Sequence, residues 1–349
     1  MRALRIKTFG VVALLGCVCS SAVLAGDEDG AVIQFEIGNE DRGIFAPVFE
    51  PVFDNTVGED TADGHLSWSW RVAYTPHRTN PKWFKPIKRY LPWLSDESTV
   101  RTSSSLQQAA FMPDDSRKNA GFKERPHVGY LGYEERISLV DPLETHSQRI
   151  DTLAMTLGVV GPASGAEAVH EISHEAIGLS STAWEEINSE PVVNVYYEHA
   201  QRFFLLKSHA DENLEFMPYG AVALGNMFTY GAVGGTLRFG GHLTEDAGAY
   251  RLGPMLAGNN FAKKGDYIPW SVFIGGEGRA VAQNIFLDGN TFSDSASVDK
   301  KSAVWEIQMG FEIGWGASRF TVTNLWRDKE FETQGDPDQL LKASFSYSY

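Results

Sequence analysis

Apolar and polar residues alternate with a period of two along much of this chain. The segment 64–74, GHLSWSWRVAY, places Leu66, Trp68 and Val72 on one face, and the segment 305–315, WEIQMGFEIGW, repeats the pattern. The final residues, ASFSYSY, carry aromatic residues on one face and serines on the other. Side chains of a β-strand point alternately to its two faces, so this alternation predicts strands with one apolar and one polar face.

A soluble β-sandwich and a membrane β-barrel both show this pattern, but three features favour the barrel. The polar faces are rich in glycine and other small residues, as a barrel lumen requires; aromatic residues gather near predicted strand ends; and the chain ends within a strand on Tyr349. After residue 25 there is no apolar run long enough to predict a transmembrane helix. We therefore predict an all-β fold, a membrane-spanning antiparallel barrel of about 12 strands.

The predicted strands lie near residues 31–38, 64–75, 104–112, 127–139, 148–159, 190–204, 214–224, 228–239, 267–285, 303–315, 318–331 and 342–349. With both termini in the periplasm, this order places the 160–189 connection at the outer face and the connections 76–103 and 240–266 at the periplasmic face. Basic and aromatic residues mix in 76–103. We interpret that segment as lying at a membrane interface, the alternative being a phosphate-binding patch.

Residues 1–25 have the pattern of a secretory signal peptide. Three basic residues lie within the first seven positions, residues 9–23 are mostly apolar, and Val23, Leu24 and Ala25 form a small-residue cleavage site. We predict a signal peptide over 1–25 and a barrel over 26–349. A lipoprotein-type box at 14–17 is an alternative. Cleavage after Ala25 removes both cysteines, so no disulfide is expected in the mature chain.

The chain is acidic, with a formal net charge of −15 that becomes more negative by three once the signal peptide is removed. Because such a chain is repelled by a phosphate backbone, we expect no nucleic-acid partner. Acidity also suits divalent cations, and solubility is the alternative explanation.

A single helix is predicted over 164–178, within the outer connection 160–189. Ser164 is placed to cap it, Glu167 follows three residues later as in a capping box, and Gly178 is placed to end it. The helix contains HEISH, in which His170 and His174 lie one turn apart and share a face.

HEISH matches the HExxH pattern of zinc proteases, in which two histidines hold the metal and the glutamate activates water. Such a site needs a third protein ligand. Glu185, Glu186, Glu190 and His199 are available, but the sequence places none of them on a clear second helix. Two polar residues on an exposed helix face, and a catalytic site with one histidine, are the alternatives.

Several longer motifs resemble one known family, the lipid A 3′-O-deacylases of the outer membrane, or LpxR family. They are FEIGNEDRGIF at 35–45, MPDD at 112–115, RPHVGYLGY at 125–133, LGVVGPASGAEAVHEISHEAIG at 157–178, WEEINSEP at 184–191, NIFLDGNTFSDS at 284–295 and RDKEFETQ at 327–334. The resemblance implies an outer-membrane barrel of twelve strands whose active site lies near the outer rim. The implied partner is lipid A, within lipopolysaccharide, together with other outer-membrane lipids.

The activity implied by the resemblance is calcium-dependent hydrolysis of the ester that links the 3′ acyloxyacyl group to lipid A. A histidine acts as the general base on water, and calcium stabilises the developing oxyanion. Ester hydrolysis needs both an activated water and a positive site for the tetrahedral oxygen. Calcium prefers oxygen ligands.

Carried over by position, the resemblance assigns the base to His174 and an Asn-Asp pair to Asn39 and Glu40, with Glu40 as a calcium ligand. The family's Thr falls on Ala62, although a slip of one residue supplies Thr61. The family's Glu falls on Ser180, and its Gln becomes His170, which creates the HExxH pattern. His170, Thr61 and Glu175 are further candidates for supporting roles, Glu175 as a nearby acid that could compensate for the substituted positions.

Three functions are therefore open from the sequence. The first is an ester hydrolase that deacylates lipid A. The second is a barrel of the same fold that has lost catalysis and has a binding or structural role, which the substitutions at Glu40, Ala62 and Ser180 suggest. The third is a zinc metalloprotease based on HEISH.

Overall fold

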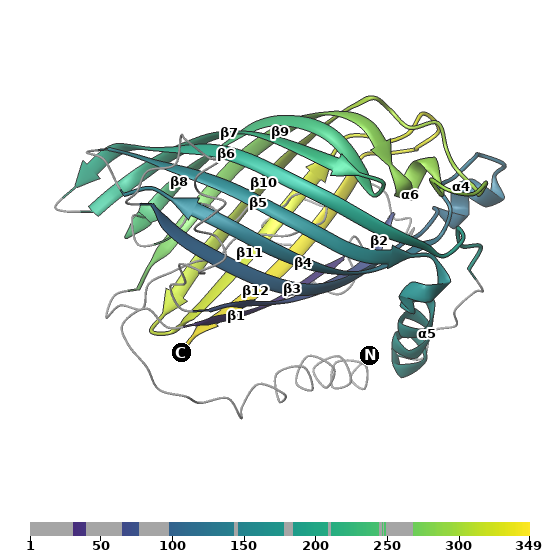
Figure 1. Cartoon of the computed structure of the whole chain (residues 1–349), viewed down its shortest axis with the longest axis horizontal. Helices are drawn as coiled ribbons and strands as arrows, with labels where there is room; N and C mark the ends of the chain where they lie inside the picture. Colours follow the sequence, from purple (N-terminus) through teal and green to yellow (C-terminus); the bar gives the residue numbers. More distant parts are fainter. Residues whose placement is uncertain are drawn as a thin grey trace, which may run out of the picture.

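The computed structural model describes residues 31–39, 65–76, 98–142, 146–177, 184–208, 211–243, 246, 248 and 268–349. Over these residues, twelve antiparallel strands form one closed barrel, in which strands adjacent in sequence pair and β1 closes on β12 (Figure 1). The predicted twelve-stranded barrel is thus confirmed. The predicted signal peptide lies outside the described residues.

The strands are β1 (Val32–Asn39), β2 (Leu66–Thr75), β3 (Thr99–Phe111), β4 (Val128–Val140), β5 (Ser147–Val160), β6 (Glu190–Ser208), β7 (Asp211–Gly225), β8 (Phe228–Gly241), β9 (Trp270–Asn284), β10 (Ala303–Trp315), β11 (Ser318–Arg327) and β12 (Asp338–Ser348). Three α-helices, α4 (Asp115–Asn119), α5 (Ala166–Ile177) and α6 (Ile285–Asp288), lie in connections at one end, which we call the helix end. The other end, at which β1 begins and β12 ends, is the terminal end (Figure 1). Among the described helices, none is long and apolar enough to cross a membrane.

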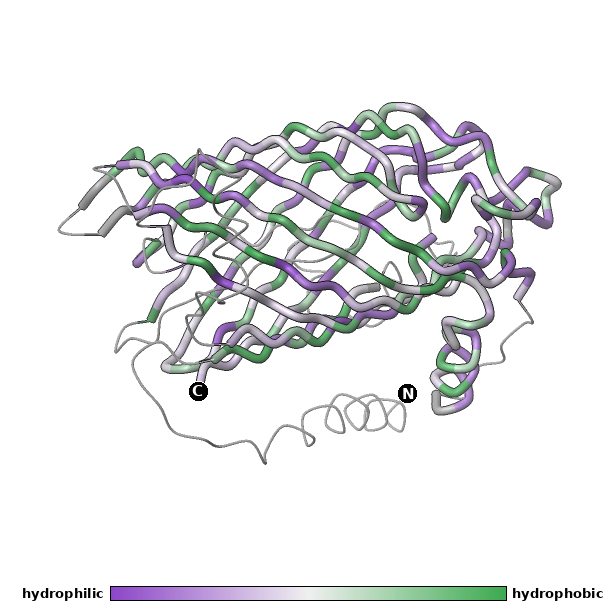
Figure 2. Tube along the Cα trace, viewed as in Figure 1, coloured by the Kyte–Doolittle hydropathy of each residue, from purple (hydrophilic) through white to green (hydrophobic). Residues whose placement is uncertain are grey.

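Hydrophobic and hydrophilic residues are interspersed along the strands (Figure 2), and their burial divides them between the lumen and the outer surface. In β10, Trp305, Ile307 and Phe311 are exposed, whereas Glu306 and Glu312 are buried. Apolar residues outside and polar residues inside are the reverse of a soluble protein, and are the pattern of a barrel surrounded by lipid.

Two strands begin four or more residues earlier than the sequence predicted. β3 starts at Thr99, not at 104, so residues 99–103 belong to the wall and not to the connection. β12 starts at Asp338, not at 342. Hydroxyl side chains occupy both faces of β3 near its start, and Leu340 and Leu341 occupy both faces of β12. Alternation is therefore lost there, although the backbone pairing continues.

The lumen is filled by an apolar layer at the helix end. Helix α6 folds into the barrel, where Ile285, Phe286 and Leu287 are almost fully buried. The ring centroid of Phe286 lies 4.4 Å from that of Phe111 and 5.4 Å from that of Phe228. Asn284 caps the helix, since its side chain accepts a hydrogen bond from the Phe286 amide. This layer is the main apolar core of the described residues.

A charged cluster fills the lumen toward the terminal end. Asp246, from the connection between β8 and β9, accepts hydrogen bonds from Arg238 on β8 (2.7 and 2.8 Å) and Arg319 on β11 (3.1 Å). Arg202 on β6 pairs with Glu215 on β7 at 2.5 Å and contacts Asp246 at 3.4 Å. Because these arginines point into the lumen, Asp246 itself lies inside the barrel.

Candidate active site on the outer face of the barrel wall

The segment before α5 is shaped by a glycine and a proline. Gly161 has a φ of 79°, and a Cβ there would meet the backbone of Ile187 and Asn188. Pro162 then opens a short 3-10 helix that ends at Ser164. The Ser164 hydroxyl accepts a hydrogen bond from the Ala166 amide (3.2 Å), in keeping with its predicted capping role.

The predicted capping box does not form. The Ser164 amide donates to the Gly161 carbonyl (2.9 Å), while the Glu167 carboxylate accepts from the Trp184 amide (2.9 Å). Glu167 therefore ties the helix to the segment that follows it in the chain, rather than closing the first turn. Gly178, the predicted end of the helix, lies outside the described residues.

Helix α5 begins against the outer face of the wall formed by β3 and β4. Gln107 points into the lumen and donates to the Tyr130 hydroxyl (3.3 Å), so its neighbour Gln108 faces outward. Gln108 donates to the Ser164 carbonyl (2.8 Å) and accepts from the Trp70 indole (3.0 Å). Figure 1 accordingly shows α5 outside the outline of the barrel, at the helix end.

A glycine on β4 allows this close approach. Gly129 neighbours the inward Tyr130 and so faces outward, and a Cβ on it would collide with the Ser164 hydroxyl and the Ala166 methyl group. Its amide donates to Glu186 Oε1 (3.2 Å). The start of α5 and the segment 184–187 thus both rest on the wall at this residue.

Four aromatic rings form a continuous row between the wall and the helix. The ring centroids of His127 and Trp184 lie 5.5 Å apart with planes at 20°, and those of Trp184 and His170 lie 5.4 Å apart. His170 and His174 are closer, at 3.8 Å. His127 Nδ1 accepts a hydrogen bond from the Glu185 amide (3.2 Å), which leaves the proton of a neutral ring on Nε2. We call these residues the ring row.

Burial shifts the protonation of groups along the ring row. Burial, with smaller contributions from His174 and His127, lowers the pKa of His170 to about 4. Burial and then Lys118 lower the pKa of His127. Burial also raises the pKa of Glu186 to about 7, and the nearby Glu167 adds to the effect. At neutral pH the wall side of the site therefore presents neutral imidazoles.

Hydrogen bonds fix the segment after α5 to the connection between β9 and β10. The Asn188 amide donates to the Asn290 side chain, and the Asn290 side chain donates back to the Asn188 carbonyl, both at 2.8 Å. The carboxylate of Glu190 accepts from the amides of Thr291 (2.9 Å) and Phe292 (3.2 Å). The motif at 284–295 therefore supplies both the α6 plug and this anchor.

The structure brings some of the predicted site residues to one place. His174 and His170 lie side by side on α5, and Glu175 is exposed on the same helix. Asn39 ends β1 and pairs with Leu341 on β12, so its backbone is at the helix end. Glu40, Thr61, Ala62 and Ser180 lie outside the described residues.

HEISH does not have the surroundings of a zinc site over the described part of the chain. No group of three or more His, Cys, Asp or Glu side chains is placed there to hold a metal ion. Glu186 is turned toward Gly129, Glu190 toward the Thr291 and Phe292 amides, and the exposed Glu185 toward Lys118 at 2.7 Å. His199 lies on β6 and pairs with Asp151 at 2.8 Å.

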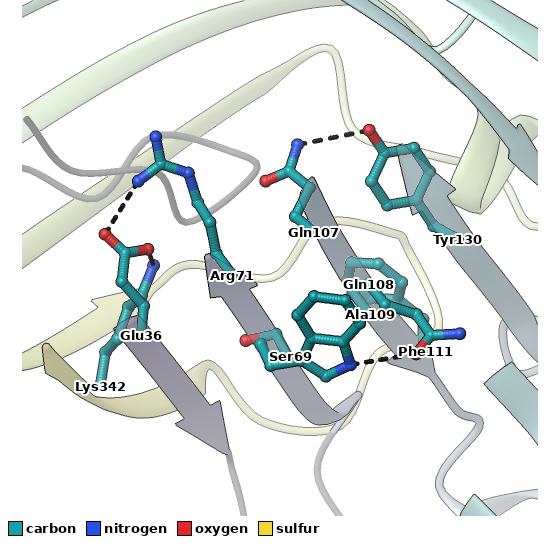
Figure 3. Close-up of a pocket in the computed structure, with 10 residues that line it drawn as sticks. Glu36, Ser69, Arg71, Gln107, Gln108, Ala109, Phe111, Tyr130 and Lys342 are labelled. Carbon is teal, nitrogen blue, oxygen red and sulfur yellow. Dashed lines mark hydrogen bonds and ion pairs between the residues drawn. The ribbon is translucent and has the colours of Figure 1, made fainter. Parts of the chain in front are cut away.

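A polar hollow in the lumen lies on the opposite side of the wall from α5 (Figure 3). There Glu36 lies between Arg71, at 3.1 Å, and Lys342, at 2.6 Å. One oxygen of this carboxylate faces each cation, so each of the three charged groups has a partner of opposite charge within the cluster. We assign it to the structure of the barrel and place the candidate active site outside the wall, where the histidines are.

A closed barrel with a polar lumen and an apolar outer surface defines a membrane β-barrel, here with a histidine-bearing helix on its outer wall. The family model described as "Outer membrane protein LpxR" matches residues 13–349. The chain therefore belongs to the LpxR family of outer-membrane proteins, as its motifs predicted.

Comparison of structures agrees with this assignment at the level of the fold. LpxR from Salmonella typhimurium matches with a TM-score of 0.71 and 18% sequence identity, covering 91% of this chain and 100% of that one. The beta domain of the Bordetella autotransporter BrkA matches at a TM-score of only 0.42 and 9% identity, covering 93% of this chain and 100% of that one. Among curated proteins, no sequence matches this chain.

The sequence did not indicate Trp184 or Gln108 as parts of this site, and it offered Glu186 only as an available ligand for a zinc ion. Trp184 and Glu186 lie in the WEEINSEP motif, but their place depends on a parallel bridge between Glu186 and His127. Gln108 is two residues from Leu106, an outward-facing residue of β3 that is exposed. A polar residue at an outward position was the one available signal that something covers the wall there.

Proposed function

We propose that this protein is an outer-membrane ester hydrolase that removes the 3′-linked acyloxyacyl group from lipid A. The observation that carries the proposal is the position of His174. The helix that bears it is anchored to the lipid-facing side of the wall, at one end of the barrel, rather than in the lumen. A substrate whose acyl chains lie in the bilayer reaches that side laterally. Family membership supports the same substrate class.

In the proposed reaction His174 acts as general base. It takes a proton from water as the water oxygen bonds to the ester carbonyl carbon. When the tetrahedral intermediate collapses, the bond to the 3′ oxygen breaks and the proton is returned to that oxygen. The products are the free acyloxyacyl acid and a lipid A with a 3′ hydroxyl group.

The family resemblance implies calcium, and the donor chemistry of Asn39 and Glu40 suits such an ion. Asn39 ends β1 at the helix end, and Glu40 is the next residue of the sequence; the two residue types carry an amide oxygen and a carboxylate. These are the hard oxygen donors that calcium prefers. Asn39 and Glu40 are the residues we propose to hold it. When bound, calcium supplies positive charge for the oxyanion.

The test is mass spectrometry of lipid A from cells that express the wild-type chain or His174→Ala, with calcium and after chelation. We expect loss of the 3′ acyloxyacyl group with the wild-type chain in calcium and an intact lipid A with the variant. Lipid A that is unchanged under every condition would rule out the hydrolase. It would favour the alternative suggested by Ala62 and Ser180, a barrel that has lost catalysis.

A further inference from the structure

Helix α5 presents one face to the wall and the opposite face to its surroundings. Glu167, His170 and His174 follow one another at spacings of three and four, so they share a face. His170 is only 4% exposed, whereas Ile172, on another face, is 67% exposed. His174 is partly exposed, one turn beyond His170. The accessible imidazole thus rests beside a buried one.

The buried imidazole is held from three elements. Trp184 contacts the His170 ring on one side and stacks on His127, at the start of β4, on the other. The Trp184 backbone is fixed to α5 through Glu167, and the next amide, that of Glu185, is fixed to His127. A ring enclosed in this way has little rotamer freedom.

The ring of His170, itself held in place, restricts the orientation of the adjacent His174 ring. Their centroids are 3.8 Å apart, which is van der Waals contact between the rings. The low pKa of His170 keeps it neutral at working pH, so a proton gained by His174 during the reaction meets no neighbouring charge there. Other ionisable groups near the two histidines include Glu167, Glu171 and Glu175 on the same helix, together with His127, Glu186 and the Glu185–Lys118 pair.

We infer that His170 is a positioning residue, whose buried ring holds the His174 imidazole in the orientation in which it accepts a proton from water. The inference rests on the proposed hydrolase function and deepens it. It also gives HEISH a role that requires no metal ligand. The ring, and not its nitrogen atoms, carries the effect.

The test compares steady-state kinetics of His170→Ala, His170→Phe and the wild-type protein on lipid A in detergent micelles. A misplaced general base lowers turnover by up to about 100-fold. We therefore expect His170→Ala to lower kcat by roughly 10- to 100-fold with KM changed less than about twofold, because substrate contacts remain. His170→Phe keeps a ring in the same place and should retain kcat within about fivefold of the wild type.

Ile172→Ala is the matched control on the exposed face of the same helix, and we expect its kcat to be unchanged. Hydrogen exchange of the α5 amides shows whether each variant keeps the helix docked. His170→Ala with wild-type kcat would overturn the inference, and so would His170→Phe as impaired as His170→Ala while α5 remains docked. A wild-type protein without activity above His174→Ala contradicts the proposed function instead, so the two failures are distinguishable.

Discussion

Asp246 is expected to stabilise the barrel by closing a charged cluster inside the lumen. Its carboxylate contacts three arginines that come from β6, β8 and β11, and it also accepts from the Gly248 amide (2.9 Å). Within the cluster Glu215 and Glu312 supply the remaining negative charges. Replacing Asp246 with alanine leaves three buried guanidinium groups opposite two carboxylates.

The expected cost of Asp246→Ala follows from that imbalance. Removing one partner of a buried ion pair costs about 3–5 kcal/mol, because the other charge remains desolvated. The matched control is Asp299→Asn, since the Asp299 side chain is 82% exposed and lies 3.9 Å from Lys123. Exposed pairs of this kind contribute about 0–1 kcal/mol.

The assay is urea unfolding of the barrel reconstituted in lipid vesicles, followed by tryptophan fluorescence and by the heat-dependent mobility of folded barrels on gels. We expect Asp246→Ala to unfold at a clearly lower urea concentration and Asp299→Asn to match the wild type. The double variant Asp246→Ala, Arg238→Ala should be less unstable than the sum of its parts, because it removes one unpaired cation. Equal midpoints for Asp246→Ala and Asp299→Asn would refute this account of the cluster.

Three further predictions concern the wall and its two sides. Gly129→Val should undock α5 and abolish deacylation while the barrel still folds, because the added side chain meets the start of the helix. Measurements of deacylation and of gel mobility test this. A fully active variant would contradict it. The pKa of Glu186 is raised from 4.5 to about 7, so its contribution to docking is complete below about pH 4.5 and is lost as the pH rises through 7. Hydrogen exchange of the α5 amides should therefore accelerate between about pH 4.5 and pH 7 by more than their intrinsic pH dependence. Glu186→Gln should remove this additional acceleration. The same additional acceleration in the variant would count against the role of Glu186 in docking. Because α6 and the Asp246 cluster fill the lumen at two levels, the wild-type barrel should show no steady ion current in a planar bilayer, whereas the double variant Phe286→Ala, Asp246→Ala should admit one; a wild-type pore would show that the lumen is open.

The alternation of residues predicted the barrel well where one face is polar and the other apolar, as in β10. It failed where the lumen itself is apolar. At the helix end Leu325 and Leu340 point inward and are almost fully buried, so their strands show apolar residues on both faces. The period of two in hydropathy reflects only the difference between the lumen and the outer surface. It disappears where both are apolar.

The candidate site was predictable only in part for a related reason. His174 and the helix that carries it follow from local motifs, and both were found. The partners of that helix come from elsewhere in the chain: Gln108 from β3, Gly129 from β4 and Trp184 from the segment after α5. The positions of these partners next to α5 depend on strand register and on the bridge between His127 and Glu186. A local sequence pattern encodes neither.

At Gln107 and Gln108 the barrel wall is one backbone thick. Two neighbouring residues, joined by a single peptide bond, hold Tyr130 in the interior and the base of α5 on the membrane side. A change to the packing inside the barrel is therefore one residue away from the scaffold of the candidate catalytic helix. Because only one backbone separates the two sides, a mutation or a small molecule inside the barrel can alter events at the bilayer, although the interior is remote from any lipid.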